Sequence, residues 1–146
     1  MGRVSIARDV MPEFNLHRTG KVPIKFSGEQ IAHADGQEIK SDWDQRYWEI
    51  HLYRTAKNKR LVAQVAYRAN PKYRKEPPFD QVEVFDDPKE LEKFLMEYDP
   101  TSCVLGFPPK PQFEEMQRQE MVKTRNHWGT LVSQVLTQAG FVENLD

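Results

Sequence analysis

The clearest pattern along the chain is an alternation of apolar and polar residues over residues 46–54. One side of this stretch carries Trp48, Ile50 and Leu52, and a period of two is typical of a half-buried β-strand. The alternation resumes over residues 61–69, after the short polar stretch TAKNKR. Two alternating stretches joined by a short polar loop predict an antiparallel hairpin.

Two further stretches extend this hairpin. Residues 81–85, QVEVF, alternate and predict another strand. Residues 22–33 open with three alternating apolar residues and predict a strand with Gly28 at a bend or bulge. Residues 1–20 mix Pro, Asn and Gly with scattered apolar residues, so we expect them to be irregular or flexible.

The period changes to that of a helix after residue 86. Asp87 suits the N-cap, Pro88 suits the first helical position, and Glu90 lies where a capping box places an acidic residue. Asp99-Pro100 ends the pattern, because a residue before proline is disfavoured in a helix. The apolar residues that recur at helical spacing between these signals are Leu91, Phe94, Leu95 and Tyr98.

The last predicted element covers residues 112–139, which contain no proline, and Gly140 is a natural stop. The pattern is compatible with one long helix or with two helices broken near residues 126–129. The second half is apolar enough to belong to the core. The first half, EEMQRQEMVKTR, has a thin apolar stripe of Phe113, Met116 and Met121. It either lies across the sheet with a wide solvated face, or forms a seam with a second copy or another chain.

Strands that are followed by helices, rather than alternating with them, predict an α+β fold. We expect an antiparallel β-meander of three to five strands with two or three helices, the C-terminal one long, packed on one face. Trp48, Ile50 and Leu52 are expected to face these helices. A chain of 146 residues can bury a sizeable core, so residues 1–146 are expected to form one domain.

The composition of the chain indicates the cellular compartment in which we expect the protein. No stretch approaches the ~20 apolar residues of a membrane span, and MGRVSIARDV lacks the apolar region of a signal peptide. Cys103 is the single cysteine, so no internal disulfide can form, and we expect it to be a buried inert thiol. These features predict a cytoplasmic protein without a membrane role.

Charge is distributed unevenly along the chain. Residues 50–75 hold eight basic residues and no acidic one, whereas residues 76–99 hold nine acidic residues and two lysines. The two segments either form a dipolar surface or cancel if they pack side by side. Clustered Lys and Arg with an interleaved Tyr suit phosphates and bases, or an acidic protein surface; the plain alternative is solubilising loops. The candidate partner-binding residues are Arg54, Lys57, Lys59, Arg60, Arg68, Lys72, Tyr73, Arg74 and Lys75.

The second side of the strand at residues 46–54 is a candidate ligand face, which carries Tyr47, Glu49, His51 and Tyr53. Residues two apart on a strand share a face, so the carboxylate neighbours the imidazole, and such pairs can perform acid–base chemistry between flanking aromatic rings. The solvated side of a sheet that is covered on its other side carries the same mixture of residues. We prefer this second interpretation.

The four histidines are His17, His33, His51 and His127, and none belongs to a metal-binding motif, so we expect no metal and no other cofactor. No motif in the chain specifies a reaction. The sequence therefore predicts a small non-catalytic binding or accessory protein that acts through the basic meander, with a protein or a nucleic acid as its partner. The alternative is a small enzyme or ligand-binding protein that uses the candidate ligand face.

Overall fold

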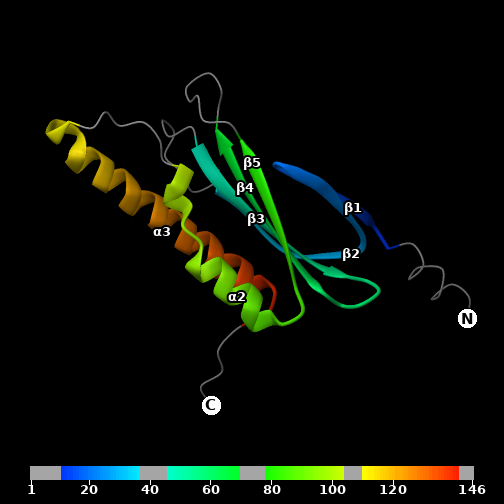
Figure 1. The fold of residues 1–146 in the computed structure, drawn as a ribbon. Helices are drawn as coiled ribbons and strands as arrows, with labels where there is room; N and C mark the ends of the chain where they lie inside the picture. Colours follow the sequence, from blue (N-terminus) through cyan, green and yellow to red (C-terminus); the bar gives the residue numbers. More distant parts are fainter. Residues whose placement is uncertain (1–10, 37–45, 70–77, 104–109, 142–146) are drawn as a thin grey trace, which may run out of the picture.

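The structure is a computed structural model that describes residues 11–36, 46–69, 78–103 and 110–141 (Figure 1). It confirms the predicted α+β fold, because a five-stranded antiparallel meander carries two helices, of which the C-terminal one is long. The elements in chain order are β1 (Glu13–Arg18), β2 (Lys21–Asp35), β3 (Arg46–Thr55), β4 (Leu61–Ala69), β5 (Phe79–Phe85), α2 (Pro88–Glu97), the 3₁₀ turns η2 (Pro100–Cys103) and η3 (Pro111–Phe113), and α3 (Glu114–Gln138).

The strands are neighbours in the order in which they occur along the chain, β1-β2-β3-β4-β5. The predicted hairpin of β3 and β4 is confirmed, with Ile50 opposite Val65 and Leu52 opposite Ala63. All four of these side chains are buried on the face that the helices cover, which is where the alternation places the apolar side of β3.

Residues 13–18 form β1, so the expected irregular segment over residues 1–20 is wrong for this part. The strand has only two inward apolar residues, Phe14 and Leu16, which is too short a run to show a period. Its order comes from pairing with β2, where Phe14 lies opposite Phe26 and Leu16 opposite Ile24.

Strand β2 is shared between two partners, and Gly28 lies where the pairing changes. Residues up to Ser27 pair with β1, and residues from Gly28 onward pair with β3. A Cβ atom at Gly28 would overlap the backbone carbonyl oxygen of Arg54, so only glycine fits this crossing. The bulge that the sequence suggests is displaced slightly, to the stretch between Gln30 and Ala32.

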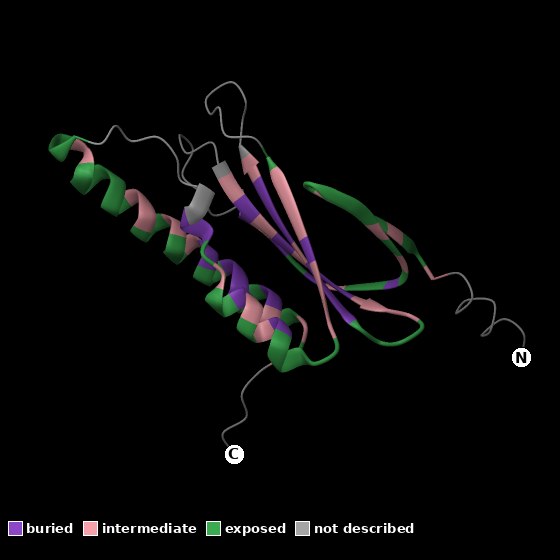
Figure 2. Ribbon diagram, viewed as in Figure 1, coloured by how far each residue is buried: buried purple, intermediate pink, exposed green. Residues whose placement is uncertain are grey.

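The shared strand lets the β1–β2 hairpin cover part of the sheet face that is turned away from the helices (Figure 1). A second hydrophobic core forms beneath it, separate from the main core between sheet and helices (Figure 2). Its buried members are Leu16, Tyr53, Val62 and Val82, against which Phe14, Ile24, Phe26 and Val84 pack.

The main core is centred on the ring of Trp48. Four aromatic rings surround it, with centroids 5.1 Å away for Tyr67, 5.7 Å for Phe79, 5.5 Å for Tyr98 and 5.4 Å for Trp128. Trp128 comes from α3, and its Nε1–H donates a hydrogen bond of 2.9 Å to the carbonyl oxygen at position 95 in α2. One aromatic cluster therefore joins the sheet to both helices.

The helix ends follow the local signals in the sequence. The Asp87 side chain accepts a hydrogen bond of 2.9 Å from the backbone N–H of Lys89, and Pro88 occupies the first turn of α2. Gly140 follows α3 with φ of 81°, the left-handed conformation that a terminating glycine adopts. From Glu114 to Gln138, α3 is one continuous helix that runs through Gly129. This settles the choice between one helix and two.

The first half of α3 contributes none of the buried residues of the helix. The buried residues of α3 are Trp128, Leu131, Val132 and Val135, so none of residues 114–127 is buried. Figure 2 shows this half in green and pink as it extends past the sheet, while purple is confined to the second half. The prediction that the second half belongs to the core is confirmed.

Two glycine substitutions test this fold in opposite directions. We expect Gly28→Ala to lower the free energy of unfolding by about 1–3 kcal/mol, because the added methyl group must displace backbone at the β2–β3 crossing. Gly129→Ala has no heavy atom within 4 Å of the added methyl group, so it should raise that free energy by roughly 0.5–1 kcal/mol. Urea unfolding of both variants measures the difference, and equal effects would contradict the assigned crossing.

Candidate functional site

The candidate ligand face lies on the side of the sheet opposite the helices, but the β1–β2 hairpin divides it. Tyr53 is buried in the second core, where its ring lies 4.8 Å from that of Phe14 and 5.5 Å from that of Phe26. Its hydroxyl donates a hydrogen bond of 3.3 Å to Gln64, and burial raises the pKa of this hydroxyl. Tyr53 therefore helps to hold the hairpin on the sheet, and its ring is not available for stacking on a ligand.

The uncovered part of this face is organised around Arg68. Glu49, Ala66 and Asp80 occupy one row across β3, β4 and β5. The guanidinium of Arg68 reaches both carboxylates, with Nε 3.6 Å from Glu49 Oε2 and Nη2 2.9 Å from Asp80 Oδ1. The intervening Ala66 is fully buried, so its small side chain leaves room for an ion-pair bridge across three strands.

His51 extends this network toward β2. Its Nδ1 lies 2.9 Å from Gln30 Nε2, and its Nε2 lies 4.0 Å from Glu49 Oε2. With Gln30 donating to Nδ1, the imidazole carries its hydrogen on Nε2, on the side of the carboxylate. The His33 ring lies parallel to that of His51, with centroids 6.1 Å apart and an angle of 10°.

These neighbours fix the charge of Glu49. The pKa of its carboxyl is lowered, first by the Nε2–H of His51 that is directed toward it and then by the positive charge of Arg68, while partial burial opposes both effects. Burial and the charge of Glu49 raise the pKa of the Tyr47 hydroxyl. A carboxylate that is held ionised makes a poor general acid and a weak general base, so the network is better suited to joining strands than to proton transfer.

The candidate partner-binding residues do not form one continuous cationic surface in the described part of the chain. The Arg54 guanidinium lies 3.8 Å from Glu29, that of Arg60 lies 2.8 Å from Asp86, and Arg68 bridges the two carboxylates described above. Lys57 and Lys59 are exposed at the β3–β4 turn, where Lys59 has φ of 54°. The remaining candidates, Lys72, Tyr73, Arg74 and Lys75, lie outside the described residues.

These ion pairs also show how the basic and the acidic segments of the sequence are arranged in the fold. β4 and β5 are adjacent, so basic residues from positions 50–75 meet acidic residues from positions 76–99, as in Arg68–Asp80 and Arg60–Asp86. Where the structure describes them, these two ion pairs neutralise part of the charge of both segments within the domain.

The outer face of α3, which points away from the main core, is an exposed helix surface that carries apolar residues. It consists of Glu115, Met116, Gln119, Val122, Lys123 and Asn126, all of them exposed. Met116 is 53% exposed and Val122 is 48% exposed. The sequence pattern singles out Phe113, Met116 and Met121, yet Phe113 and Met121 are partly buried. Val122 was missed, although its spacing from Gln119 and Met116 places all three on one face.

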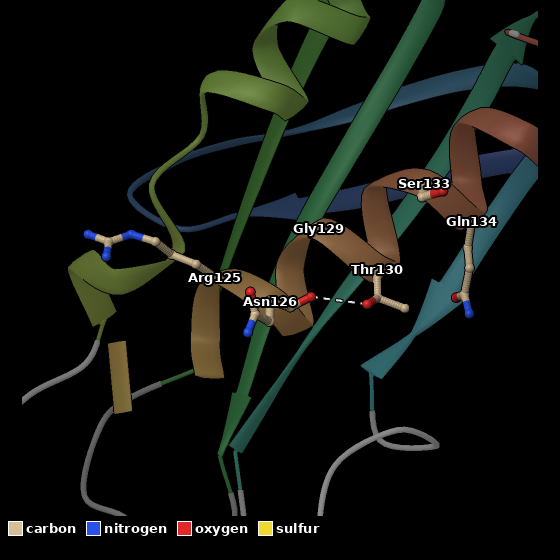
Figure 3. Close-up of a pocket in the computed structure, with 6 residues that line it drawn as sticks. All are labelled: Arg125, Asn126, Gly129, Thr130, Ser133 and Gln134. Carbon is tan, nitrogen blue, oxygen red and sulfur yellow. Dashed lines mark hydrogen bonds between the residues drawn. The ribbon is translucent and has the colours of Figure 1, made fainter. Parts of the chain in front are cut away.

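A shallow hollow of about 590 Å³ follows the outer face toward the C-terminus of α3 (Figure 3). Its lining residues are Arg125, Asn126, Gly129, Thr130, Ser133 and Gln134. All six come from one helix, and the Thr130 hydroxyl donates its hydrogen bond to the backbone carbonyl of Asn126. Polar groups that converge from several elements are typical of a small-molecule site, and this hollow lacks them.

In the parts of the chain that the structure describes, no group of three or more His, Cys, Asp or Glu side chains is placed to hold a metal ion. No helix in these parts is long and apolar enough to cross a membrane. The Cys103 side chain lies outside the described residues, so its expected burial stays a prediction.

The state of Glu49 predicts how stability depends on pH. A carboxyl whose pKa is lower in the folded chain than its ordinary value of 4.5 adds stability above that value, and the contribution is lost as the pH falls through the folded pKa. We therefore expect Glu49→Gln to be less stable than the wild type near neutral pH and to show a shallower loss of stability below pH 4.5. Urea unfolding midpoints between pH 7 and pH 3 (about four values) measure both effects.

The matched control is Glu29→Gln, because that carboxylate is 56% exposed and lies 3.8 Å from Arg54. Its profile should follow that of the wild type. If Glu49→Gln loses stability below pH 4.5 as steeply as the wild type does, the ion pairs of Glu49 do not cause this pH dependence.

The chain was also compared with known proteins. No protein-family model, no curated protein and no solved structure matches it.

Proposed function

We propose that the chain is a non-catalytic binding protein that engages a protein partner through the outer face of α3. The observation that carries this proposal is the lack of any buried residue among residues 114–127 of α3, together with the exposure of Met116 and Val122. We also propose a cytoplasmic location, which rests on the single cysteine of the chain.

A helical segment that extends away from its domain needs stabilising contacts to remain helical. Isolated helices shorter than ~12–15 residues are marginal in water, and most helical stability in proteins comes from packing one face against something else. The first half of α3 packs only its inner side, through partly buried residues such as Met121 and Thr124. A partner on the outer face would cover Met116 and Val122 and stabilise this half.

The distribution of charge favours a protein over a nucleic acid. Phosphate recognition requires several cationic side chains that are free to neutralise the backbone. Among the candidate basic residues that the structure describes, the three arginines already have carboxylate partners, which leaves Lys57 and Lys59. The outer face of α3 carries a balanced mixture of one acidic, one basic, two apolar and two amide side chains, as protein interfaces commonly do.

Capture experiments with matched variants test this proposal. Tagged wild-type chain and tagged Met116→Glu and Val122→Glu variants are incubated with lysate of the native host, and captured proteins are quantified by mass spectrometry. We expect both variants to retain about tenfold less of a specific protein, because a charge in the centre of the contact has to be desolvated.

The control is Met96→Glu, which places the same charge at an exposed methionine of α2. It should capture the same proteins as the wild type. If the two α3 variants also capture the wild-type set in wild-type amounts, the outer face of α3 is not the contact surface.

The second candidate function is nucleic-acid binding through the basic meander, and the observation that favours it is the exposure of Lys57 and Lys59 at the β3–β4 turn. Lys72, Arg74 and Lys75 are the further cationic residues that would take part in this contact. The aromatic ring of Tyr73 would stack on a base.

Salt dependence tests this second candidate. If it is correct, fluorescence anisotropy with labelled single-stranded RNA or DNA should show an affinity that falls by roughly 50- to 300-fold between 50 and 200 mM salt, as expected for about four to six phosphate contacts. Lys57→Glu combined with Lys59→Glu should weaken that binding and reduce the slope against salt. Binding that is absent at low salt, or is unaffected by the two substitutions, contradicts the nucleic-acid function.

A further inference from the structure

We propose that the outer edge of β1 binds the β1 strand of a second copy of this chain, in an antiparallel pair centred on Asn15. β1 is an end strand of the sheet and pairs only with β2. It lies on the side of the sheet away from α2 and α3 (Figure 1), so this contact is separate from the outer face of α3 and goes beyond the proposed function. Edge strands are templates for pairing with another chain, because one row of their backbone groups is not used within the sheet.

Two hydrogen bonds near the ends of β1 show how its backbone groups are directed. The carbonyl oxygen of Pro12 accepts a hydrogen bond of 3.0 Å from the N–H of Gly28 in β2, whereas the N–H of Thr19 donates one of 2.9 Å to the carbonyl oxygen of Asp80, away from β2. Backbone groups alternate in direction along an antiparallel strand. The N–H and C=O groups at positions 13, 15 and 17 therefore point away from β2, and no backbone hydrogen bond to them is present among the described residues.

The outer edge of β1 lacks the features that usually protect a strand edge. Lysine, proline and bulges are common protections, and residues 13–18 contain neither lysine nor proline. The irregularity in the β1–β2 pairing adds a residue to β2, so β1 itself stays regular. Glu13, Asn15 and His17 are all exposed. A second strand can therefore approach this edge and pair with it.

The sequence of β1 complements itself in an antiparallel pair. Opposite residues of such a pair lie on the same face of the sheet. With the twofold axis at Asn15, Glu13 lies opposite His17 of the second copy, and Phe14 lies opposite Leu16 of the second copy. The first kind of pair joins a carboxylate to an imidazole on the solvated face, and the second kind joins apolar residues beside the second core. A twofold axis forms each pair twice, and the outward backbone groups of the two strands exchange about six hydrogen bonds.

The side chains of the charged pair are able to take part. The Glu13 carboxylate lies 3.0 Å from Lys25 Nζ, and its side chain is 57% exposed. A carboxylate has about four lone-pair sites, so this ion pair leaves acceptor capacity for the imidazole of the second copy. Oppositely charged residues that face each other across two strands stabilise the pairing, so the order of charges along β1 favours a second copy as the partner.

The proposed contact is small, which sets its expected strength. A strand of six residues is roughly 20 Å long. A single pair of such strands buries less than the ~1,200–2,000 Å² of a stable interface. The dimer should therefore dissociate at micromolar concentrations and form as the concentration rises.

Sedimentation velocity with two substitutions of His17 tests the pairing. The full chain is measured from ~10 to ~500 μM near neutral pH, and the sedimentation coefficient of the wild type should rise toward that of a dimer. His17→Lys places a permanent positive charge opposite Glu13 of the second copy, twice per dimer, and should strengthen association roughly fivefold. His17→Glu places two carboxylates opposite each other and should weaken association roughly fivefold.

The matched controls are Met96→Lys and Met96→Glu, which introduce the same charges at an exposed residue of α2. Both should associate like the wild type, and circular dichroism of every variant checks that the fold is retained. A wild-type chain that stays monomeric over this range overturns the proposal. So do His17 variants whose association changes in the same direction or does not change.

Amide hydrogen exchange followed by NMR locates the contact within β1. Raising the protein concentration from ~20 to ~500 μM should slow exchange at Glu13, Asn15 and His17, because their N–H groups become bonded to the second copy. Exchange at Phe14 and Leu16 should not change, because their N–H groups point toward β2 in both states. Association that leaves exchange at the first three positions unchanged uses a different surface and overturns the proposal.

Discussion

The contact between Trp48 and Trp128 is the interaction on which the rest of the structure depends. It joins the central strand to α3, and the hydrogen bond from Trp128 to the backbone of α2 fixes the second helix in the same cluster. Trp128 is also the first buried residue of α3, and it lies near the middle of that helix. The position of one tryptophan therefore decides which half of α3 belongs to the core and which half stays outside it.

The length of β2 has a comparable effect on the other face of the sheet. Because β2 pairs first with β1 and then with β3, the β1–β2 hairpin can fold over one end of that face and create the second core around Tyr53. The other end stays open to water and is held together by charge, with Arg68 between Glu49 and Asp80. Removing one member of a half-buried ion-pair network leaves its partner uncompensated, so residues of this type are retained for structural reasons alone. This explains why a histidine beside a glutamate on a strand does not by itself indicate a catalytic site.

The sequence predicts those features that local chemistry determines. The alternation over residues 46–54 and the signals around Asp87 and Gly140 require only neighbours in the chain, and the structure confirms them. β1 could not be predicted, because its two inward residues acquire a buried face only when β2 pairs with them. Tyr53 was assigned to an open face for the same reason, since the curl of the hairpin is a property of the whole sheet. The sequence also does not indicate which carboxylates pair with the arginines, because each ion pair joins residues on different strands or beyond a strand end.

The ion pairs that join β4 and β5 and the residues at their ends limit which charged side chains can take part in recognition. A block of basic residues followed by a block of acidic residues suggests a polar surface, yet antiparallel pairing of the two segments turns that asymmetry into ion pairs within the domain. Side chains that already form such pairs cannot neutralise a partner without breaking them. The outer face of α3 differs in its apolar content, because Met116 is 53% exposed and Val122 is 48% exposed on that face. Apolar side chains gain free energy when a partner covers them, and this is why we propose the long helix as the contact surface.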